Sequence, residues 1–171
     1  MDARTSKENY YLDIAQTVLE RATCMRRIYG AIIVKNDEII STGYNGAPRG
    51  RQNCIDMGYC TREKLQVPRG ERYELCRSVH AEANAIISAA RRDMVGGTLY
   101  LVGKDARSGE LLHDATSCSM CRRLIINAGL DKVVIRHTET EFEVVPVQQW
   151  VDEDDAERLD ANGCSGCAEQ K

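Results

Sequence analysis

The sequence lacks any run of about 18 apolar residues, the length that a helix needs to cross a bilayer. Its first residues, Met-Asp-Ala-Arg-Thr-Ser-Lys-Glu, contain no apolar stretch of the kind that a secretory signal requires. We see neither an internal repeat nor a linker. These absences predict one cytoplasmic domain that is not associated with a membrane.

Charge of one sign is concentrated at one end of the chain. Residues 138–171 carry ten acidic and two basic side chains, whereas the net charge of the whole chain is −3. The remainder is therefore modestly basic, which suits a small phosphorylated ligand better than long nucleic acid. We interpret residues 1–150 as the domain and residues 151–171 as an acidic C-terminal tail without chemistry of its own.

Hydrophobic periodicity predicts alternating helices and strands. Helical patterns occupy residues 8–23, a stretch beginning at His80, a stretch ending at Gly129, and residues 148–159. β-rich runs occupy residues 29–35, 38–44, 98–102, 132–137 and 143–147, with a hairpin turn at Asn36-Asp37 and an edge position indicated by Pro146. This order predicts an α/β fold in which helices cover both faces of the sheet.

The strongest functional signal is His80-Ala-Glu82 combined with Cys118-Ser-Met-Cys121, each at the start of a predicted helix. The spacing of the cysteines places both sulfurs on one side of the first helical turn. A helix N-terminus favours the thiolate form, which is the form that binds metal. His80, Cys118 and Cys121 would therefore hold a zinc ion, provided that His80 meets the two cysteines in the fold.

Three protein ligands leave one tetrahedral position of zinc for water, as in catalytic rather than structural sites. Zinc lowers the pKa of bound water toward about 7. Glu82 would then act as the proton shuttle, which takes a proton from water and delivers it to the substrate.

The same motif resembles the H-x-E…P-C-x-x-C signature of the cytidine/deoxycytidylate deaminase superfamily. Further segments are similar to bacterial deoxycytidylate deaminases, so that the resemblance covers about residues 8–137. These segments are Cys24-Met-Arg26, Tyr29-Gly-Ala-Ile-Ile-Val, Ser41-Thr-Gly-Tyr-Asn-Gly-Ala-Pro48, Glu74-Leu-Cys-Arg-Ser-Val-His-Ala-Glu-Ala-Asn-Ala-Ile87 and Arg123-Leu-Ile-Ile-Asn-Ala-Gly129.

The resemblance implies a three-layer α/β/α deaminase fold with a mixed central sheet, and conversion of dCMP to dUMP and ammonia. It assigns zinc binding to His80, Cys118 and Cys121, and proton transfer to Glu82. It also implies that Asn45 contacts the sugar or phosphate, that Arg26 binds the phosphate, and that the backbone of Ala81 binds the pyrimidine carbonyl. Homo-oligomers, often hexamers regulated by dCTP and dTTP, are implied as well.

Two features depart from the family pattern. Ser117 stands where the family has proline, and we expect it to cap the following helix. The loop of residues 103–116 is longer than usual, and we expect it to lie beside the pocket.

The cysteine-rich segment of residues 45–77, which we call the insert, lacks a clear pattern of secondary structure. Such a long irregular stretch is usually functional or clamped by something. Cys24, Cys54, Cys60 and Cys76 suggest a second, structural zinc site, which some related deaminases have, although one or two of them could be ordinary buried cysteines. Cys164 and Cys167 could be redox-active, bind metal with a neighbouring subunit, or have no role.

Two other functions remain open from the sequence. The chain could act on a different amino-substituted nucleoside, nucleotide or base. It could also be a zinc-stabilised regulatory protein without catalysis, although the presence of Glu82 and all three ligands favours an enzyme.

Overall fold

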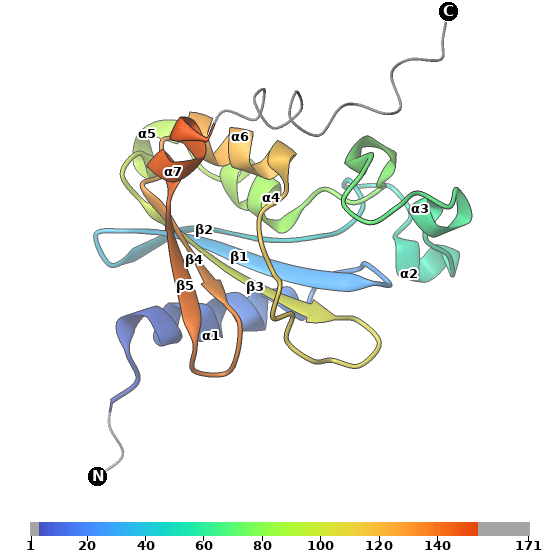
Figure 1. Cartoon of the computed structure of the whole chain (residues 1–171), viewed down its shortest axis with the longest axis horizontal. Helices are drawn as coiled ribbons and strands as arrows, with labels where there is room; N and C mark the ends of the chain where they lie inside the picture. The colour runs from blue at the N-terminus through green and yellow to red at the C-terminus, as the bar shows by residue number, and fades with distance from the viewer. Residues whose placement is uncertain (1–3, 154–171) are drawn as a thin grey trace, which may run out of the picture.

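The computed structural model describes residues 4–153, which form a five-stranded sheet between two layers of helices (Figure 1). The strand order is β2-β1-β3-β4-β5. The strands are β1 (Arg27–Lys35), β2 (Glu38–Tyr44), β3 (Thr98–Asp105), β4 (Lys132–Arg136) and β5 (Phe142–Pro146). Only β3 and β4 pair in parallel, and the other three pairs are antiparallel. The mixed sheet that the resemblance implied is confirmed.

One helix covers the first face of the sheet. Helix α1 (Lys7–Leu19) buries Leu12, Ala15 and Leu19 against a cluster that includes Ile32 and Val102. The helix predicted for residues 8–23 ends four residues earlier in the structure, at Leu19, and Glu20 is its C-cap.

Four helices pack on the opposite face, above the sheet in Figure 1. They are α4 (Ala81–Ile87), α5 (Arg91–Met94), α6 (Ser119–Ala128) and α7 (Val147–Asp152). Gly129 ends α6 in the left-handed conformation, with φ 78°, as predicted. The predicted three-layer α/β/α architecture is confirmed.

The β1–β2 hairpin turns where the sequence predicts it. Asn36 and Asp37 have φ values of 52° and 64°, the left-handed pair of a tight hairpin turn. β5 is an edge strand that ends at Pro146, as expected.

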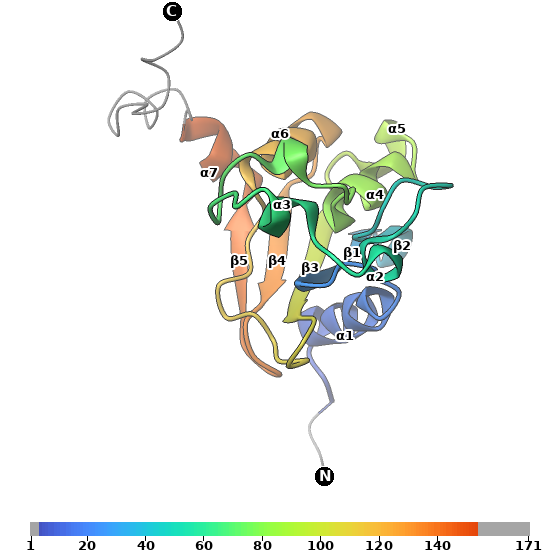
Figure 2. The same ribbon diagram turned by 90° about the vertical axis from the view of Figure 1, so that its right-hand side faces the viewer.

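The insert is more ordered than its sequence indicates. It contains the short helices α2 (Cys54–Met57) and α3 (Thr61–Lys64) and the 3-10 turn η1 (Tyr73–Leu75). Each is too short to show a helical period in the sequence. Figures 1 and 2 show α2 and α3 beyond the end of the sheet at which β1 begins.

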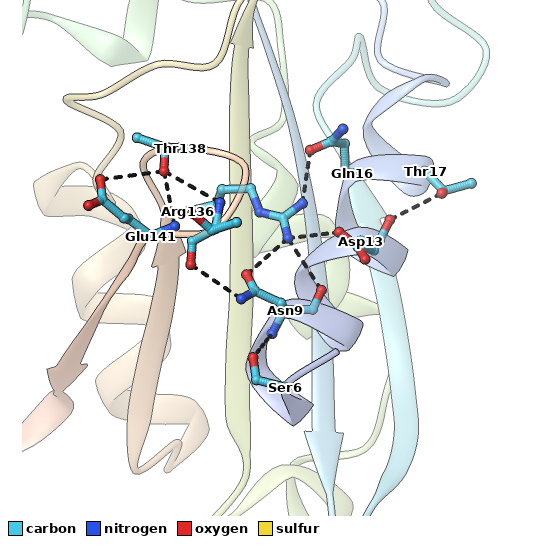
Figure 3. Close-up of polar contacts among 9 residues, drawn as sticks. Ser6, Asn9, Asp13, Gln16, Thr17, Arg136, Thr138 and Glu141 are labelled. Carbon is cyan, nitrogen blue, oxygen red and sulfur yellow. Dashed lines mark hydrogen bonds and ion pairs between the residues drawn. The ribbon is translucent and has the colours of Figure 1, made fainter. Parts of the chain in front are cut away.

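A buried arginine joins β4 to α1 across the first face of the sheet (Figure 3). The guanidinium of Arg136 lies 2.7 Å from the Asp13 carboxylate. It also donates to Gln16 Oε1 at 3.0 Å and to the backbone and side-chain oxygens of Asn9 at 3.3 Å. This network fixes α1 to the sheet on the face opposite to α4 and α6.

Two boundary predictions remain untested. The expected domain end at residue 150 falls within α7, and most of the predicted tail, with Cys164 and Cys167, lies outside the described residues. Within residues 4–153 no helix combines the length and the apolar character needed to span a membrane.

Candidate metal centre and active site

The structure brings His80, Cys118 and Cys121 together at the N-termini of two neighbouring helices. Their ligand atoms lie within 4.8 Å of one another, and no other group of three potential ligands within residues 4–153 is this close. Nδ1 of His80 is 3.4 Å from Sγ of both Cys118 and Cys121. The predicted convergence of the three residues is confirmed.

Two of the three ligand residues are also the N-cap residues of their helices. His80 is the N-cap of α4, and Cys118 is the N-cap of α6. The expectation that Ser117 caps α6 is wrong: this residue precedes the cap, and its side chain is buried beside Glu82, whose pKa it lowers. The ligand set is nevertheless retained, because Cys118 itself has the extended conformation of a cap, with ψ 164°.

Contacts with β2 fix the start of α4. Gly43 allows close approach of the helix, since a Cβ at this position would lie 2.3 Å from both the Ala81 carbonyl oxygen and the Ala85 amide nitrogen. The Ser41 hydroxyl also donates to the Ala85 carbonyl at 2.7 Å. The Asn84 amide donates to the Tyr44 carbonyl at 2.8 Å. The backbone that carries His80 and Glu82 is therefore held on the sheet.

The donor set fits zinc. In a tetrahedral site with Zn–N of about 2.0 Å and Zn–S of about 2.3 Å, nitrogen and sulfur are roughly 3.5 Å apart. The observed separations of 3.4 Å match this requirement. Two thiolates and a neutral imidazole are also the mixed ligands that zinc prefers.

Hydrogen bonds couple the protonation of these three groups. Hydrogen bonds with Cys118 and Cys76 raise the pKa of His80 to about 10, against the opposing effect of burial. The hydrogen bond from Cys121, together with the His80 imidazolium, lowers the pKa of Cys118 to about 4 although burial opposes it. The same hydrogen bond with Cys118, reinforced by burial, raises the pKa of Cys121. Because a metal binds the thiolate and neutral imidazole forms, metal binding at these residues would release protons.

Glu82 is on the first turn of α4 and is almost completely buried, with 4% of its surface exposed. Burial raises the pKa of its carboxyl, and the charge of His80 opposes this shift. It lines the same pocket as His80 and Cys118. A carboxyl group with a raised pKa next to a metal site is suited to receiving and returning a proton.

Arginines surround the pocket that these residues line. Four of them contribute to its wall: Arg26, Arg27, Arg62 and Arg69. Ala81 and Asn45 line it as well, while Thr116 comes from the loop of residues 103–116. The expectation that this loop lies beside the pocket is confirmed.

Asn45 has a structural role that the sequence does not reveal. Its side-chain oxygen accepts from the Tyr29 amide at 2.7 Å, and its side-chain nitrogen donates to the Arg27 carbonyl at 2.9 Å. The side chain therefore bridges the backbone of β1 and lines the pocket. Arg26 also lines the pocket, and its Nε lies 3.0 Å from the Glu63 carboxylate. Whether either residue contacts a substrate stays a prediction.

The four cysteines proposed for a second zinc site are near one another without forming a tight cluster. Burial raises the pKa of Cys54, with further contributions from Cys24, Cys76 and Cys60. For Cys76, burial is the largest single effect, but hydrogen bonds with His80 and Ser78 and the charge of His80 together outweigh it, so that the pKa of Cys76 is lowered. Cys24, Cys60 and Cys76 all line the pocket. The second zinc site stays a prediction.

Arg62 is a residue whose importance sequence reasoning missed. It is 7% exposed, and it donates to the carbonyl oxygens of Pro68 and Glu71 at 2.8 and 2.5 Å. Its guanidinium stacks on Tyr73 at 4.6 Å, and the Tyr73 ring meets the His80 ring edge-on at 5.5 Å. Arg62 looked like one of several basic residues in the insert, and no local signal distinguishes it.

The fold and the site together define a zinc-binding α/β/α protein with a buried glutamate beside the metal ligands. Residues 5–137 match the family model of the cytidine and deoxycytidylate deaminase zinc-binding region. The chain belongs to this family.

Individual relatives agree with the family match. A deoxycytidylate deaminase of Mycobacterium phage D29 is 34% identical over 137 residues, which cover 77% of this chain and 95% of the relative. A deoxycytidylate deaminase of Schizosaccharomyces pombe is 34% identical over 135 residues, 79% of this chain but only 38% of the yeast protein. The chain thus spans less than half of the yeast relative and nearly all of the phage relative.

A solved structure supports the fold. The crystal structure of the dCMP deaminase from the cyanophage S-TIM5 superposes with a TM-score of 0.53 at 24% identity, covering 78% of this chain and 85% of the cyanophage chain.

Proposed function

We propose that this protein catalyses the hydrolytic deamination of a cytosine nucleotide, with dCMP as the substrate and dUMP and ammonia as products. The observation that carries the proposal is the buried Glu82 in the same pocket as His80 and Cys118, a pocket that four arginines also line. The phage and Schizosaccharomyces pombe relatives, each 34% identical to this chain, are named deoxycytidylate deaminases.

The reaction replaces the C4 amino group of cytosine by an oxygen from water. Zinc, when bound by His80, Cys118 and Cys121, lowers the pKa of a coordinated water molecule to near 7. Glu82 would accept one proton from the attacking water and deliver it to ring nitrogen N3. It would then accept the second proton from the oxygen newly bonded to C4 and deliver it to the departing amine. The C4–N bond breaks, a C4–O bond forms, and ammonia leaves.

Burial suits Glu82 to this exchange. A carboxyl whose pKa is raised holds the proton more strongly between the two transfers than an exposed carboxylate would. The backbone of Ala81, which is fully buried at the N-terminus of α4, would bind the pyrimidine carbonyl. Arg26 would bind the phosphate, and Asn45 would contact the sugar or phosphate while bridging β1.

We also propose the structural zinc site formed by Cys24, Cys54, Cys60 and Cys76. All four are free thiols, and Cys54 is 5% exposed. A metal here would stabilise an insert that contains only one-turn helices. The unpaired thiols also support a reducing, cytoplasmic location.

The resemblance extends the proposal to assembly and regulation. We expect a homo-oligomer, with a hexamer as one form, and regulation by dCTP and dTTP. Size-exclusion chromatography would test the assembly, and its repetition with dCTP and with dTTP would test whether either nucleotide acts on the protein.

A substrate panel tests the function. Zinc-loaded protein is incubated with dCMP, CMP, dCTP, deoxycytidine and cytosine, and ammonia release is measured for each. We expect turnover to be highest with dCMP. Equal rates with deoxycytidine would contradict the choice of a phosphorylated substrate, and no release from any cytosine compound by zinc-loaded protein would reject the reaction.

A further inference from the structure

Two sets of ion pairs join the insert to the loop of residues 103–116, next to the start of β1. Asp114, from the loop, forms an ion pair with Arg69 of the insert and lies 3.9 Å from Arg27. Glu63, from the insert, lies 3.0 Å from Arg26 and 3.8 Å from Arg107 of the loop. Each segment therefore supplies one acid, and each acid holds an arginine of the other segment together with an arginine from the start of β1.

The ion pairs of Asp114 lie next to the pocket. Arg27 and Arg69 both line it, and they come from segments far apart in the sequence. Two guanidinium groups on one wall repel each other, so a carboxylate between them is needed to hold them there. Asp114 fills this role, and its own pKa is lowered mainly by the hydrogen bond from Arg69.

The backbones on both sides of the Arg69–Asp114 pair are anchored. Asp114 lies between Leu112 and Ala115, which are 9% and 2% exposed and pack into the core. Arg69 lies between Pro68 and Glu71, whose carbonyl oxygens are both bound by the buried Arg62. The pair therefore joins two fixed turns, which reduces the entropy lost when the side chains are held in place.

We infer that Asp114 is a positioning residue, which holds Arg27 and Arg69 side by side so that they form, together with Arg26, a receptor for the 5′-phosphate of the substrate. The inference rests on the proposed function and deepens it. Two fixed guanidinium groups can donate several charge-assisted hydrogen bonds to a phosphate, whereas free arginines would have to be ordered when it binds. The loop would thus determine the preference for a nucleotide over a nucleoside.

The first test is Asp114→Asn, which removes the charge and keeps the shape. We expect KM for dCMP to rise about three- to tenfold, because an exposed ion pair and the ordering of Arg69 are lost. We expect kcat with dCMP, and kcat/KM with deoxycytidine, to stay within about twofold, since a substrate without phosphate does not use the two arginines.

Matched variants separate positioning from general damage. Glu110→Gln removes the same charge from the same exposed loop, and Glu110 forms no ion pair within the described residues, so its KM for dCMP should not change. Asp114→Glu keeps the charge, so it should recover part of the affinity for dCMP that Asp114→Asn loses. Arg69→Gln, at a side chain that is 62% exposed, should reproduce the rise in KM without risk to folding.

Binding of the product distinguishes this inference from the proposed function. Calorimetry with dUMP and with deoxyuridine needs no turnover. Asp114→Asn should weaken the binding of dUMP and leave the binding of deoxyuridine unchanged. A wild-type protein that binds dUMP through Asp114 yet releases no ammonia from dCMP would reject the function and retain the receptor. A lower KM for dCMP in Asp114→Asn would show that Asp114 competes with the phosphate. Equal losses with both ligands would show a purely structural role. Either result overturns the inference.

Discussion

Gly43 on β2 lies directly against the backbone of Ala81 on α4, the residue between the metal ligand His80 and the buried Glu82. A methyl group at position 43 would come 2.3 Å from the Ala81 carbonyl oxygen and from the Ala85 amide nitrogen. Neither backbone atom can move without shifting α4. The sheet therefore sets the position of the metal site through a residue that has no side chain.

Gly43→Ala should displace the start of α4 and destabilise the protein. We expect a loss of about 2–4 kcal/mol in the free energy of unfolding, because the clash is with backbone rather than with a flexible side chain. Urea denaturation measures this loss, and zinc affinity should fall with it. Thr42→Ala, at the exposed neighbouring position on β2, is the control. Equal stability of the two variants would contradict the close approach.

Glu82→Gln should separate metal binding from catalysis. The amide keeps the size of the carboxyl but cannot accept and return a proton, so we expect kcat to fall by at least about a hundredfold. Zinc content, measured by mass spectrometry of the purified protein, should remain that of the wild type. Loss of zinc together with activity would mean that Glu82 supports the ligands rather than the reaction.

The metal site could be predicted from the sequence because its parts are local. A His-x-Glu and a Cys-x-x-Cys motif at helix starts specify their own geometry, and the family resemblance pairs them. The order of helices and strands along the chain could be predicted for the same reason, since the hairpin and the strand–helix–strand unit are each encoded by neighbouring residues.

Long-range partners could not be predicted in this way. Asp114 forms an ion pair with Arg69, 45 positions earlier in the chain. Arg136 is fully buried although arginine is usually exposed, and its partners on α1 lie more than a hundred residues away. Ser117 was misplaced as a cap because a cysteine can also adopt the extended conformation of that position.

The two proposed zinc sites should respond differently to substitution. We expect two zinc ions per chain in the wild type, one in Cys54→Ser and one in Cys118→Ser. Cys54→Ser should lower the midpoint of thermal unfolding while retaining activity per folded molecule, because the insert loses its metal. Cys118→Ser should abolish turnover. A count of one in the wild type would remove the structural site and leave the catalytic site unaffected.

The ion pair between Arg136 and Asp13 should contribute to stability but not to catalysis, because α1 packs on the sheet face opposite to α4 and α6. Asp13→Asn removes the charge that lies 2.7 Å from a fully buried guanidinium, which would still have Gln16 and Asn9 as acceptors. Since Asp13 is 61% exposed, we expect a loss of about 1–2 kcal/mol, less than for a wholly buried pair. In an Arg136→Met background the same substitution should have almost no effect, and a double-mutant cycle measures this coupling. Glu8→Gln, which removes an acid from the first turn of α1, is the control. A cost for Asp13→Asn no larger than that of Glu8→Gln would show that the amide and carbonyl acceptors alone stabilise the buried arginine.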